Sequence, residues 1–291
     1  MAISDRANIS VPSGRHYEAQ KHVVDFASSL GGFFETDNLL RLDNGTMLIT
    51  ERTRFTSFSI SGAFLQKLRA HKLLSQFLYP FAEGPHKLSQ LHIAGDFSVD
   101  APPVLKRLKR RAKAGEVKLT RKTIKPSAVR FIESHNYTNP KVPTGMLYLG
   151  SPKAEVRAGC YDKRNERLDK GLPDQGPTLR CELRISDKMG ISLRDVVEPD
   201  SCYWNFMADV MPRPSGVPEW VANDHNYRLE PPMTLEPYQL LRKGVETSPD
   251  VQRLIELSER LGPNGFDTLV RLLENRRELN TIQPASSNKA A

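Results

Sequence analysis

The sequence lacks any apolar run that approaches the roughly 18 residues needed to cross a bilayer, which argues against a membrane-spanning protein. Its first residues also lack the apolar core of a secretory signal peptide, so we expect a cytoplasmic protein. Cysteine is scarce, with Cys160, Cys181 and Cys202 widely spaced and no CxxC pair. This pattern argues against a disulfide framework and a zinc ribbon, and it predicts three small core residues.

Several motifs that identify common enzyme classes are absent. The chain has no Walker A loop, no GxGxxG loop, no HExxH pair and no GxSxG turn. The His-hydrophobe-His motif of many DNA-nicking relaxases is missing too, and the chain shows no internal sequence repeat. His135 and His225 have no second histidine at ligand spacing, so we interpret each as an ordinary surface or loop residue.

Positive charge, by contrast, is abundant and local. The formal net charge is +8, and residues 106–130 hold eleven cations against one acid, Glu116. A run of like charges is often only a solvated face, but this density favours a polyanion that releases its counterions on binding. No aromatic residue interrupts the run before Phe131, so we expect it to contact phosphates rather than stack on bases. The residues predicted to contact DNA in this run are Lys106, Arg107, Lys109, Arg110, Arg111, Lys113, Lys118, Arg121, Lys122 and Lys125.

The hydrophobic periodicity predicts an α+β fold, with a largely antiparallel twisted sheet, helices packed on one face and additional C-terminal helices. Helices are expected at about 17–30 and 62–78, and the basic run is expected to begin on a helix and continue into a hairpin. The predicted strands lie at about 46–60, 90–97, 146–150, 156–163 and 179–185.

Composition divides the chain into five predicted parts. A proline-rich stretch separates the central region from two short amphipathic segments, and the last residues are polar. The parts are a leader and helix at 1–40, a main domain at 41–211, a linker at 212–236, a helical hairpin at 237–280 and a disordered tail at 281–291.

Alternation on three strands predicts one shared polar face. On each strand the candidate functional side chains oppose the apolar set, and an antiparallel sheet covered on one side would bring them together on its open face. The candidates are Asp96 with His92, Tyr161 with Lys163, and Glu182 with Arg180 and Arg184.

Four segments carry a resemblance to a known family. They read L-Y-L-G-S-P from Leu147, C-Y-D-K-R-N-E from Cys160, L-R-C-E-L-R from Leu179 and Q-L-H-I-A-G-D from Gln90. In order and separation they resemble the rolling-circle replication initiators of plasmids and filamentous phages, the Rep trans family. The resemblance covers about residues 55–195. In the last segment Gln90 and His92 stand where the family usually has Arg and Asp.

The resemblance implies a metal-dependent enzyme that transfers a DNA phosphodiester onto a tyrosine. Such an enzyme stays joined to the 5′ end, leaves a free 3′-OH for a polymerase and later rejoins the strand. The implied partners are origin DNA in single-stranded or cruciform form, a host helicase or polymerase, and a second copy of the chain. The implied location is the cytoplasm of a bacterial host.

The motif positions assign roles to individual residues. Tyr161 is the expected nucleophile, and the ammonium of Lys163 would stabilise its phenolate or the phosphate. Asp96 and Glu182 are the expected ligands of Mg²⁺ or Mn²⁺, which prefer oxygen donors, and His92 is a possible third ligand. Two further cations are expected to contact DNA on this face, Arg180 and Arg184.

Each assignment has a structural alternative. Tyr161 could be a packing residue whose hydroxyl contacts water. Glu182 could belong to a cross-strand ion pair, and Asp96 could cap a turn. Tyr148 is a second tyrosine on a neighbouring strand, which we interpret as structural. Two other functions stay open: a DNA-binding regulator or replication accessory that has lost its metal site, and an RNA reader that uses an open sheet face.

Overall fold

A computed structural model describes residues 1–120, 122–223 and 229. These residues belong to the larger of two compact units, Met1–Met233. The described part of the predicted linker, which ends at residue 223 apart from Leu229, contains no helix or strand. The predicted hairpin at 237–280 and tail at 281–291 lie outside the described residues, as does Arg121.

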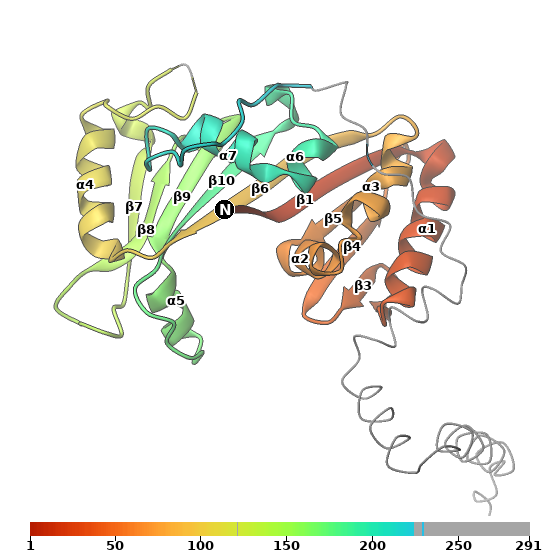
Figure 1. Ribbon diagram of the computed structural model, residues 1–291, viewed down its shortest axis with the longest axis horizontal. Helices are drawn as coiled ribbons and strands as arrows, with labels where there is room; N and C mark the ends of the chain where they lie inside the picture. Colours follow the sequence, from red (N-terminus) through yellow and green to blue (C-terminus); the bar gives the residue numbers. More distant parts are fainter. Residues whose placement is uncertain (121, 224–228, 230–291) are drawn as a thin grey trace, which may run out of the picture. The chain divides into compact units, whose positions relative to one another are not determined.

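The described residues form one twisted antiparallel sheet of ten strands (Figure 1). Its order is β2-β3-β4-β5-β1-β6-β10-β9-β8-β7, so the long strands β1 and β6 lie side by side in its middle. The strands are β1 (Ala2–Pro12), β2 (Phe33–Thr36), β3 (Leu39–Leu42), β4 (Gly45–Glu51), β5 (Phe55–Ser61), β6 (Lys87–Phe97), β7 (Val129–Ser134), β8 (Thr144–Leu149), β9 (Val156–Asp162) and β10 (Leu179–Ser186).

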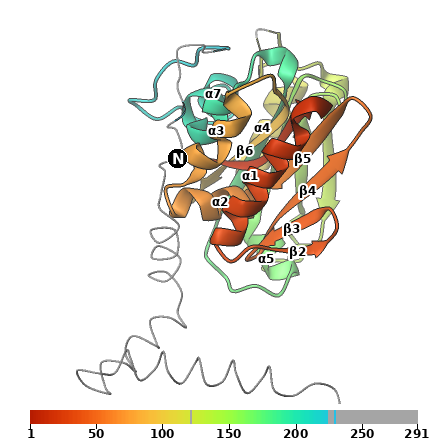
Figure 2. The same cartoon turned by 90° about the vertical axis from the view of Figure 1, so that its right-hand side faces the viewer.

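Helices cover one face of this sheet, which confirms the predicted α+β class. Figure 2 shows α1–α3 and α7 beside the strands, and α4 packs on β7, β8 and β9 through its buried leucines Leu105 and Leu108. Within the described range, no helix is long and apolar enough to span a membrane. The helices are α1 (His16–Ser29), α2 (Gly62–Ala70), α3 (Leu74–Ala82), α4 (Ala101–Lys113), α5 (Lys163–Asp169), α6 (Leu193–Val197) and α7 (Pro199–Met207).

The alternation of apolar and polar residues along the strands explains why one face of the sheet is buried and the other is open. Along β10, Leu179, Cys181, Leu183 and Ile185 are buried while the residues between them are half-buried. Side chains of successive strand residues point to opposite faces, so the buried set meets the helices and the polar set remains on the open side. Burial of each leucine contributes about 1.5–3 kcal/mol to this packing.

The two halves of the sheet share one topology, although the sequence shows no repeat. In the first half, β1 and α1 precede a meander, β2–β5, whose last strand returns to pair with β1. In the second half, β6 and α4 precede a meander, β7–β10, whose last strand returns to pair with β6. A helix pair then ends each half, α2 with α3 and α6 with α7. The halves join through the antiparallel pairing of β1 with β6.

Within the segment predicted as a leader and helix at 1–40, the helix expected at 17–30 is confirmed as α1, but the residues before it are not a loose leader. Residues Ala2–Pro12 form β1, which pairs with β5 on one side and β6 on the other. Its buried residues include small Ala2, Ser4 and Ala7, so the segment has little hydrophobic signal although its side chains alternate. The domain that the sequence placed at 41–211 therefore begins with β1. The expected helix at 62–78 is also two helices, because the chain turns at Lys72, whose φ is 58°.

The core around the second half is tightly packed. Cys160, Cys181 and Cys202 are free and buried, which confirms their predicted role as core residues. Tyr203 of α7 is also buried, and its hydroxyl donates to the carbonyl oxygen of Cys181 at 3.0 Å. A Cβ added at Gly95 would lie 2.6 Å from the Tyr203 hydroxyl oxygen, so glycine at this position allows α7 to approach β6.

Candidate active site on the open sheet face

Strand register places the candidate residues in rows that cross the open face. Arg180 lies opposite Asp96 of β6 and Tyr161 of β9, and Tyr161 lies opposite Met146 of β8. Glu182, two residues further along β10, lies between Ala94 and Gly159. Residues opposite each other in an antiparallel pair share a face and have Cβ atoms about 5 Å apart. The structure therefore brings Tyr161, Glu182, Arg180 and Asp96 together on one face, as alternation predicted.

Tyr161 and Glu182 form the centre of the site. The Tyr161 hydroxyl donates to Glu182 Oε1 at 2.8 Å. Burial and the adjacent Glu182 carboxylate raise the pKa of Tyr161 above its usual range, while nearby Arg180 acts in the opposite direction. Burial also raises the pKa of Glu182. The phenol is thus protonated at neutral pH, and the raised pKa of Glu182 makes its ionised carboxylate a stronger base towards the phenol proton.

Arg180 is fixed between carboxylates beside this pair. Its Nε and Nη2 donate to the two Asp96 oxygens at 2.6 and 2.7 Å, and its Nη1 lies 3.8 Å from Asp5 Oδ1. The bond to Asp96 raises the pKa of Arg180, so the guanidinium stays charged. This bidentate pair orients the guanidinium, and it identifies Asp96 as an ion-pair partner rather than a turn cap.

Lys163 reaches the site by a different route from the one expected. Alternation placed it on the same strand as Tyr161, but β9 ends at Asp162 and Lys163 begins α5. Asp162 caps this helix, because its Oδ1 accepts from the backbone N–H of Asn165 at 2.9 Å. Lys163 Nζ still lies 5.8 Å from the Tyr161 ring centroid, and it pairs with Glu166 at 2.5 Å.

A hollow of about 310 Å³ opens beside Tyr161 and Glu182. It lies between the ends of β7, β8 and β9 and helix α5, and five carboxylates line it. Tyr161 is only 9 % exposed, and this hollow lies directly beside it. The carboxylates that line it belong to Glu133, Asp162, Glu166, Asp169 and Glu182.

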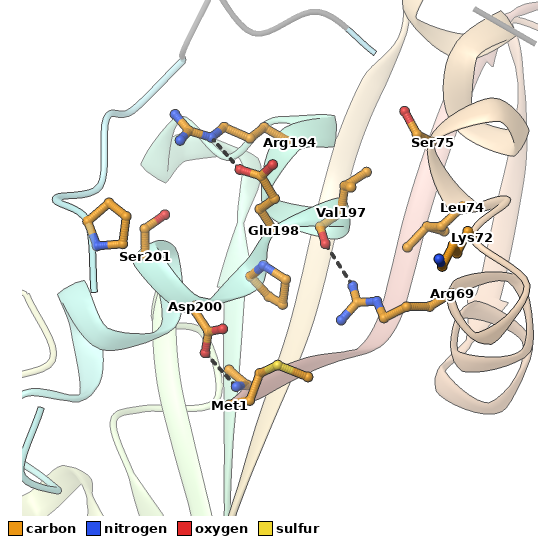
Figure 3. A pocket seen from close by; sticks show the side chains of 13 residues that line it. Met1, Arg69, Lys72, Leu74, Ser75, Arg194, Val197, Glu198, Asp200 and Ser201 are labelled. Atoms are coloured by element: carbon orange, nitrogen blue, oxygen red, sulfur yellow. Dashed lines mark hydrogen bonds and ion pairs between the residues drawn. The ribbon is translucent and has the colours of Figure 1, made fainter. Parts of the chain in front are cut away.

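A larger hollow lies elsewhere, on the helical side between the two helix pairs (Figure 3). It measures about 710 Å³, and most of its charged groups are bonded to one another or to the backbone. Arg69 donates to the carbonyl oxygen of Val197 at 3.0 Å, Arg194 pairs with Glu198 at 3.4 Å, and Asp200 accepts from the N–H of Ala2 at 2.6 Å. The contacts of Arg69 with Val197 and of Asp200 with Ala2 join the two halves of the fold, so we interpret this hollow as structural.

The expected metal ligands do not fit a divalent ion in this arrangement. His92, Asp96 and Glu182 lie on one face, but Asp96 is bound by Arg180 and Glu182 by Tyr161. His92 Nε2 lies 3.1 Å from Gln90 Oε1. Among the described residues, no group of three or more His, Cys, Asp or Glu side chains is arranged to hold a metal. Metal binding by this set therefore stays a prediction that requires Asp96 to leave Arg180.

The helical part of the basic run is separated from the tyrosine, whereas its last residue, Arg130, lies opposite Tyr148 of β8 on the open face. The run begins on α4 as predicted, but of the expected hairpin only an isolated bridge between Lys118 and Thr123 is present. Because α4 packs against the buried sheet face, its exposed cations lie across the sheet from Tyr161. This run was expected to hold DNA near the active face or to recognise the origin. The position of α4 does not favour the first role for its cations, and both roles stay predictions. The exposed cations of α4 are Lys106, Arg107, Arg110 and Lys113.

A second group of cations lies on the open face, and the sequence predicted only one of them as a DNA contact. Arg184 was predicted as a DNA contact, but it lies opposite Arg157 of β9 and His92 of β6, and His92 lies opposite Arg6 of β1. We call these four residues the arginine row. Alternation with Tyr161 on β9 could have identified Arg157, whereas Arg6 fell in the supposed leader.

Comparison with known proteins gives a distant structural likeness. No family model matches the sequence, and no curated protein matches it. The fold is similar to the solved structure of a rolling-circle replication initiator protein from Geobacillus stearothermophilus, with 12 % identity and a TM-score of 0.48. The match covers 87 % of this chain and 96 % of that chain. A likeness at this level establishes neither a family nor an activity for this chain.

Proposed function

We propose that this protein is a replication initiator that nicks one DNA strand by transferring a phosphodiester onto Tyr161. The observation that carries the proposal is the hydrogen bond from the Tyr161 hydroxyl to Glu182, with Arg180 and Lys163 beside it on an open sheet face. Two of the four sequence segments that resemble Rep trans initiators supply this tyrosine, this glutamate and both cations.

In the proposed reaction, Tyr161 Oη attacks the phosphorus of a DNA phosphodiester. Its proton passes to Glu182 Oε1, and the bond between phosphorus and O3′ breaks. The departing O3′ then takes up a proton, which leaves a 3′-OH and a 5′-phosphotyrosine. Because the pKa of Tyr161 is raised, a free phenolate is rare at neutral pH, and attack has to accompany proton transfer to Glu182.

Positive charge near the reacting oxygen would stabilise the transition state. Arg180 is held by Asp96, and Lys163 is held by Glu166, so neither side chain has to be ordered when the substrate binds. The phosphotyrosine bond keeps the energy of the broken phosphodiester. The reverse reaction, attack by a 3′-OH with Glu182 returning the proton, would therefore rejoin the strand without ATP.

A labelled cleavage assay tests the proposal. Purified protein is mixed with 5′- or 3′-labelled single strands that cover its own replicon, with Mg²⁺, Mn²⁺ or EDTA, and is resolved on a denaturing gel. We expect the label downstream of the cut to migrate with the protein, and Tyr161→Phe to abolish this shift while it still binds DNA. Dependence of the shift on the metal would also test the predicted ion.

Tyr148→Phe is the matched control, because Tyr148 lies on the neighbouring strand and shares the open face. Its shift should resemble that of the unmodified protein. If Tyr148→Phe lost the shift and Tyr161→Phe kept it, Tyr148 of β8 rather than Tyr161 of β9 would be the nucleophile. That result would overturn the proposal.

One observation favours a second function, that of a DNA-binding regulator or replication accessory without catalysis. The two oxygens of Asp96 are occupied by Arg180, which leaves the expected metal ligands unassembled. Tight, salt-sensitive DNA binding with no covalent adduct on any strand would support this function instead.

A further inference from the structure

The arginine row is a line of side chains that crosses four adjacent strands. Arg6, His92, Arg184 and Arg157 come from β1, β6, β10 and β9, and each lies opposite the next in the strand register. Adjacent strands are about 4.8 Å apart, so the row spans about 14 Å. Its members come from segments far apart in the sequence, and only the fold brings them together.

This row has no counter-charge. Within the part of the chain that the structure describes, none of its three arginines is in an ion pair or a side-chain hydrogen bond. Burial and the neighbouring Arg157 and Arg6 lower the pKa of Arg184, and burial and all three arginines lower that of His92 to about 4. Arg180, on the same strand as Arg184, is by contrast bound to Asp96. Unpaired like charges held side by side destabilise a fold unless a ligand neutralises them.

The chemistry of the row selects an anion with several oxygens. Guanidinium groups offer planar pairs of donors that match phosphate oxygens, and the row offers no carboxylate to attract a metal or a basic ligand. The row also lies on an open sheet rather than in an enclosed pocket, which suits an extended ligand.

Its position relative to Tyr161 defines which phosphate it can reach. Arg157 and Tyr161 are four residues apart on β9, which places them about 13 Å apart along the strand on the same face. Between them on β9 lies the small residue Gly159, which is opposite Glu182 of β10, and Glu182 is in turn opposite the small residue Ala94 of β6. Added to Gly159, a Cβ would make ordinary contacts at 3.7 Å or more with Met146 and Tyr148, so close packing does not explain this glycine.

We propose that the arginine row is a phosphate subsite that holds the backbone of single-stranded DNA next to the phosphodiester attacked by Tyr161. This inference rests on the proposed function for the identity of the strand. The strand would run along β9 and β10 over Gly159, with one backbone phosphate at the tyrosine and another at Arg184 and Arg157. Such a second anchor fixes the register of the strand relative to the nucleophile.

Binding measurements on the full chain test the subsite without catalysis. Arg157→Gln/Arg184→Gln is compared with the unmodified protein for anisotropy of a labelled oligothymidylate of about 20 residues, from low to high salt. Two lost phosphate contacts on a single strand should reduce the slope of log affinity against log salt by about 1.4, and weaken binding at 0.1 M salt by roughly 10- to 30-fold. An unchanged slope would overturn the proposal.

The matched control is Arg52→Gln/Arg54→Gln, which removes two exposed arginines from the turn between β4 and β5. We expect its affinity and slope to remain close to those of the unmodified protein. Thermal unfolding separates binding from misfolding, because loss of like charges should leave the melting temperature of the Arg157→Gln/Arg184→Gln variant equal or higher. If the slope of log affinity against log salt fell equally in the control, the arginine row would contribute no more than any other exposed charge. That result would contradict the subsite.

Placement next to the cut phosphate is tested with neutral methylphosphonates, introduced singly around the cleaved position in Tyr161→Phe. A methylphosphonate at one or two phosphates next to the cleaved position should weaken DNA binding by Tyr161→Phe. It should not weaken DNA binding by the variant that also lacks Arg157 and Arg184. Equal effects in both would contradict the placement. Failure of the proposed function has a different signature, namely no covalent adduct while the arginine substitutions still reduce the salt slope.

Discussion

The first and second halves of the sheet share one topology and differ in the side chains on their open face. In the first half, Asn8 of β1 lies opposite Ser59 of β5, and the Ser59 hydroxyl donates to Asn8 Oδ1 at 2.8 Å. In the second half the equivalent pairing of β6 with β10 carries Asp96 with Arg180, and Tyr161 lies on the next strand. The short neutral pair Asn8 and Ser59 thus corresponds to the charged pair Asp96 and Arg180, while Arg6 of β1 also contributes a charge to the open face.

This difference shows that folding and chemistry use separate sets of residues. Both halves bury an alternating apolar set under helices, and that set specifies the topology. The side chains on the open face contribute little to this core, so one half can carry reactive groups while the other does not. We therefore expect substitutions on the open face to have very unequal effects in the two halves.

The largest difference is expected at the proposed general base. Glu182→Gln keeps the shape of the side chain but removes its capacity to accept the Tyr161 proton. We expect the rate of adduct formation to fall by about 10²- to 10⁴-fold in single-turnover measurements, with DNA affinity little changed. Ser59→Ala in the first half is the matched control and should leave the rate unaltered. A Glu182→Gln enzyme of normal rate would exclude this carboxylate as the base.

A smaller effect separates the open face from the helical face. Lys106→Gln/Arg107→Gln/Arg110→Gln removes three exposed charges of α4, across the sheet from Tyr161. If α4 recognises the origin duplex, the slope of log affinity against log salt should fall by about 2.7, with roughly 100-fold weaker duplex binding at 0.1 M salt. Cleavage of a short single strand at saturating protein should remain. Loss of single-strand cleavage would show that α4 acts at the active face after all.

The smallest effect concerns stability against pH. The pKa of His92 is about 4 in the folded protein because of burial and the charges of Arg184, Arg6 and Arg157, against an ordinary value of 6.5. Between these pH values the unfolded chain therefore binds more protons than the folded protein. The contribution of neutral His92 to the free energy of unfolding is complete above pH 6.5 and is lost as pH falls towards 4. The change amounts to about 3 kcal/mol.

Denaturant unfolding of the unmodified protein and His92→Gln at pH 7 and pH 4.5 measures this contribution. Glu182, whose pKa is raised, acts in the opposite direction and is common to both proteins. The variant should lose less stability on acidification. Equal losses in the two proteins would mean that His92 does not titrate as the arginine row requires.

Much of the second half could be predicted from local sequence. Alternation over Leu179–Ile185 identified β10 and the face of Glu182, and the basic run was expected to begin on a helix, which is α4. Both signals arise from residues close in sequence that meet one environment.

The remaining features depend on contacts between distant segments. β1 was missed because small residues such as Ala2 and Ser4 fill its buried side, and Lys163 was misplaced because Asp162 ends β9 and caps α5. Neither the pairing of Asp96 with Arg180 nor the alignment of Arg6 with His92 and Arg184 follows from any single strand. A shift of one residue in register would move every side chain of a strand to the other face, so these contacts become visible only in the assembled sheet.

Identification of the residue that carries the nucleotide tests the central claim most directly. The covalent complex, trapped on a single strand and digested with nuclease and protease, would be analysed by mass spectrometry for a nucleotide-bearing peptide. The account predicts that the nucleotide is attached through a 5′ phosphate to Tyr161. Attachment to Tyr148 or to any other residue would contradict it, as would the absence of an adduct from protein that binds the strand.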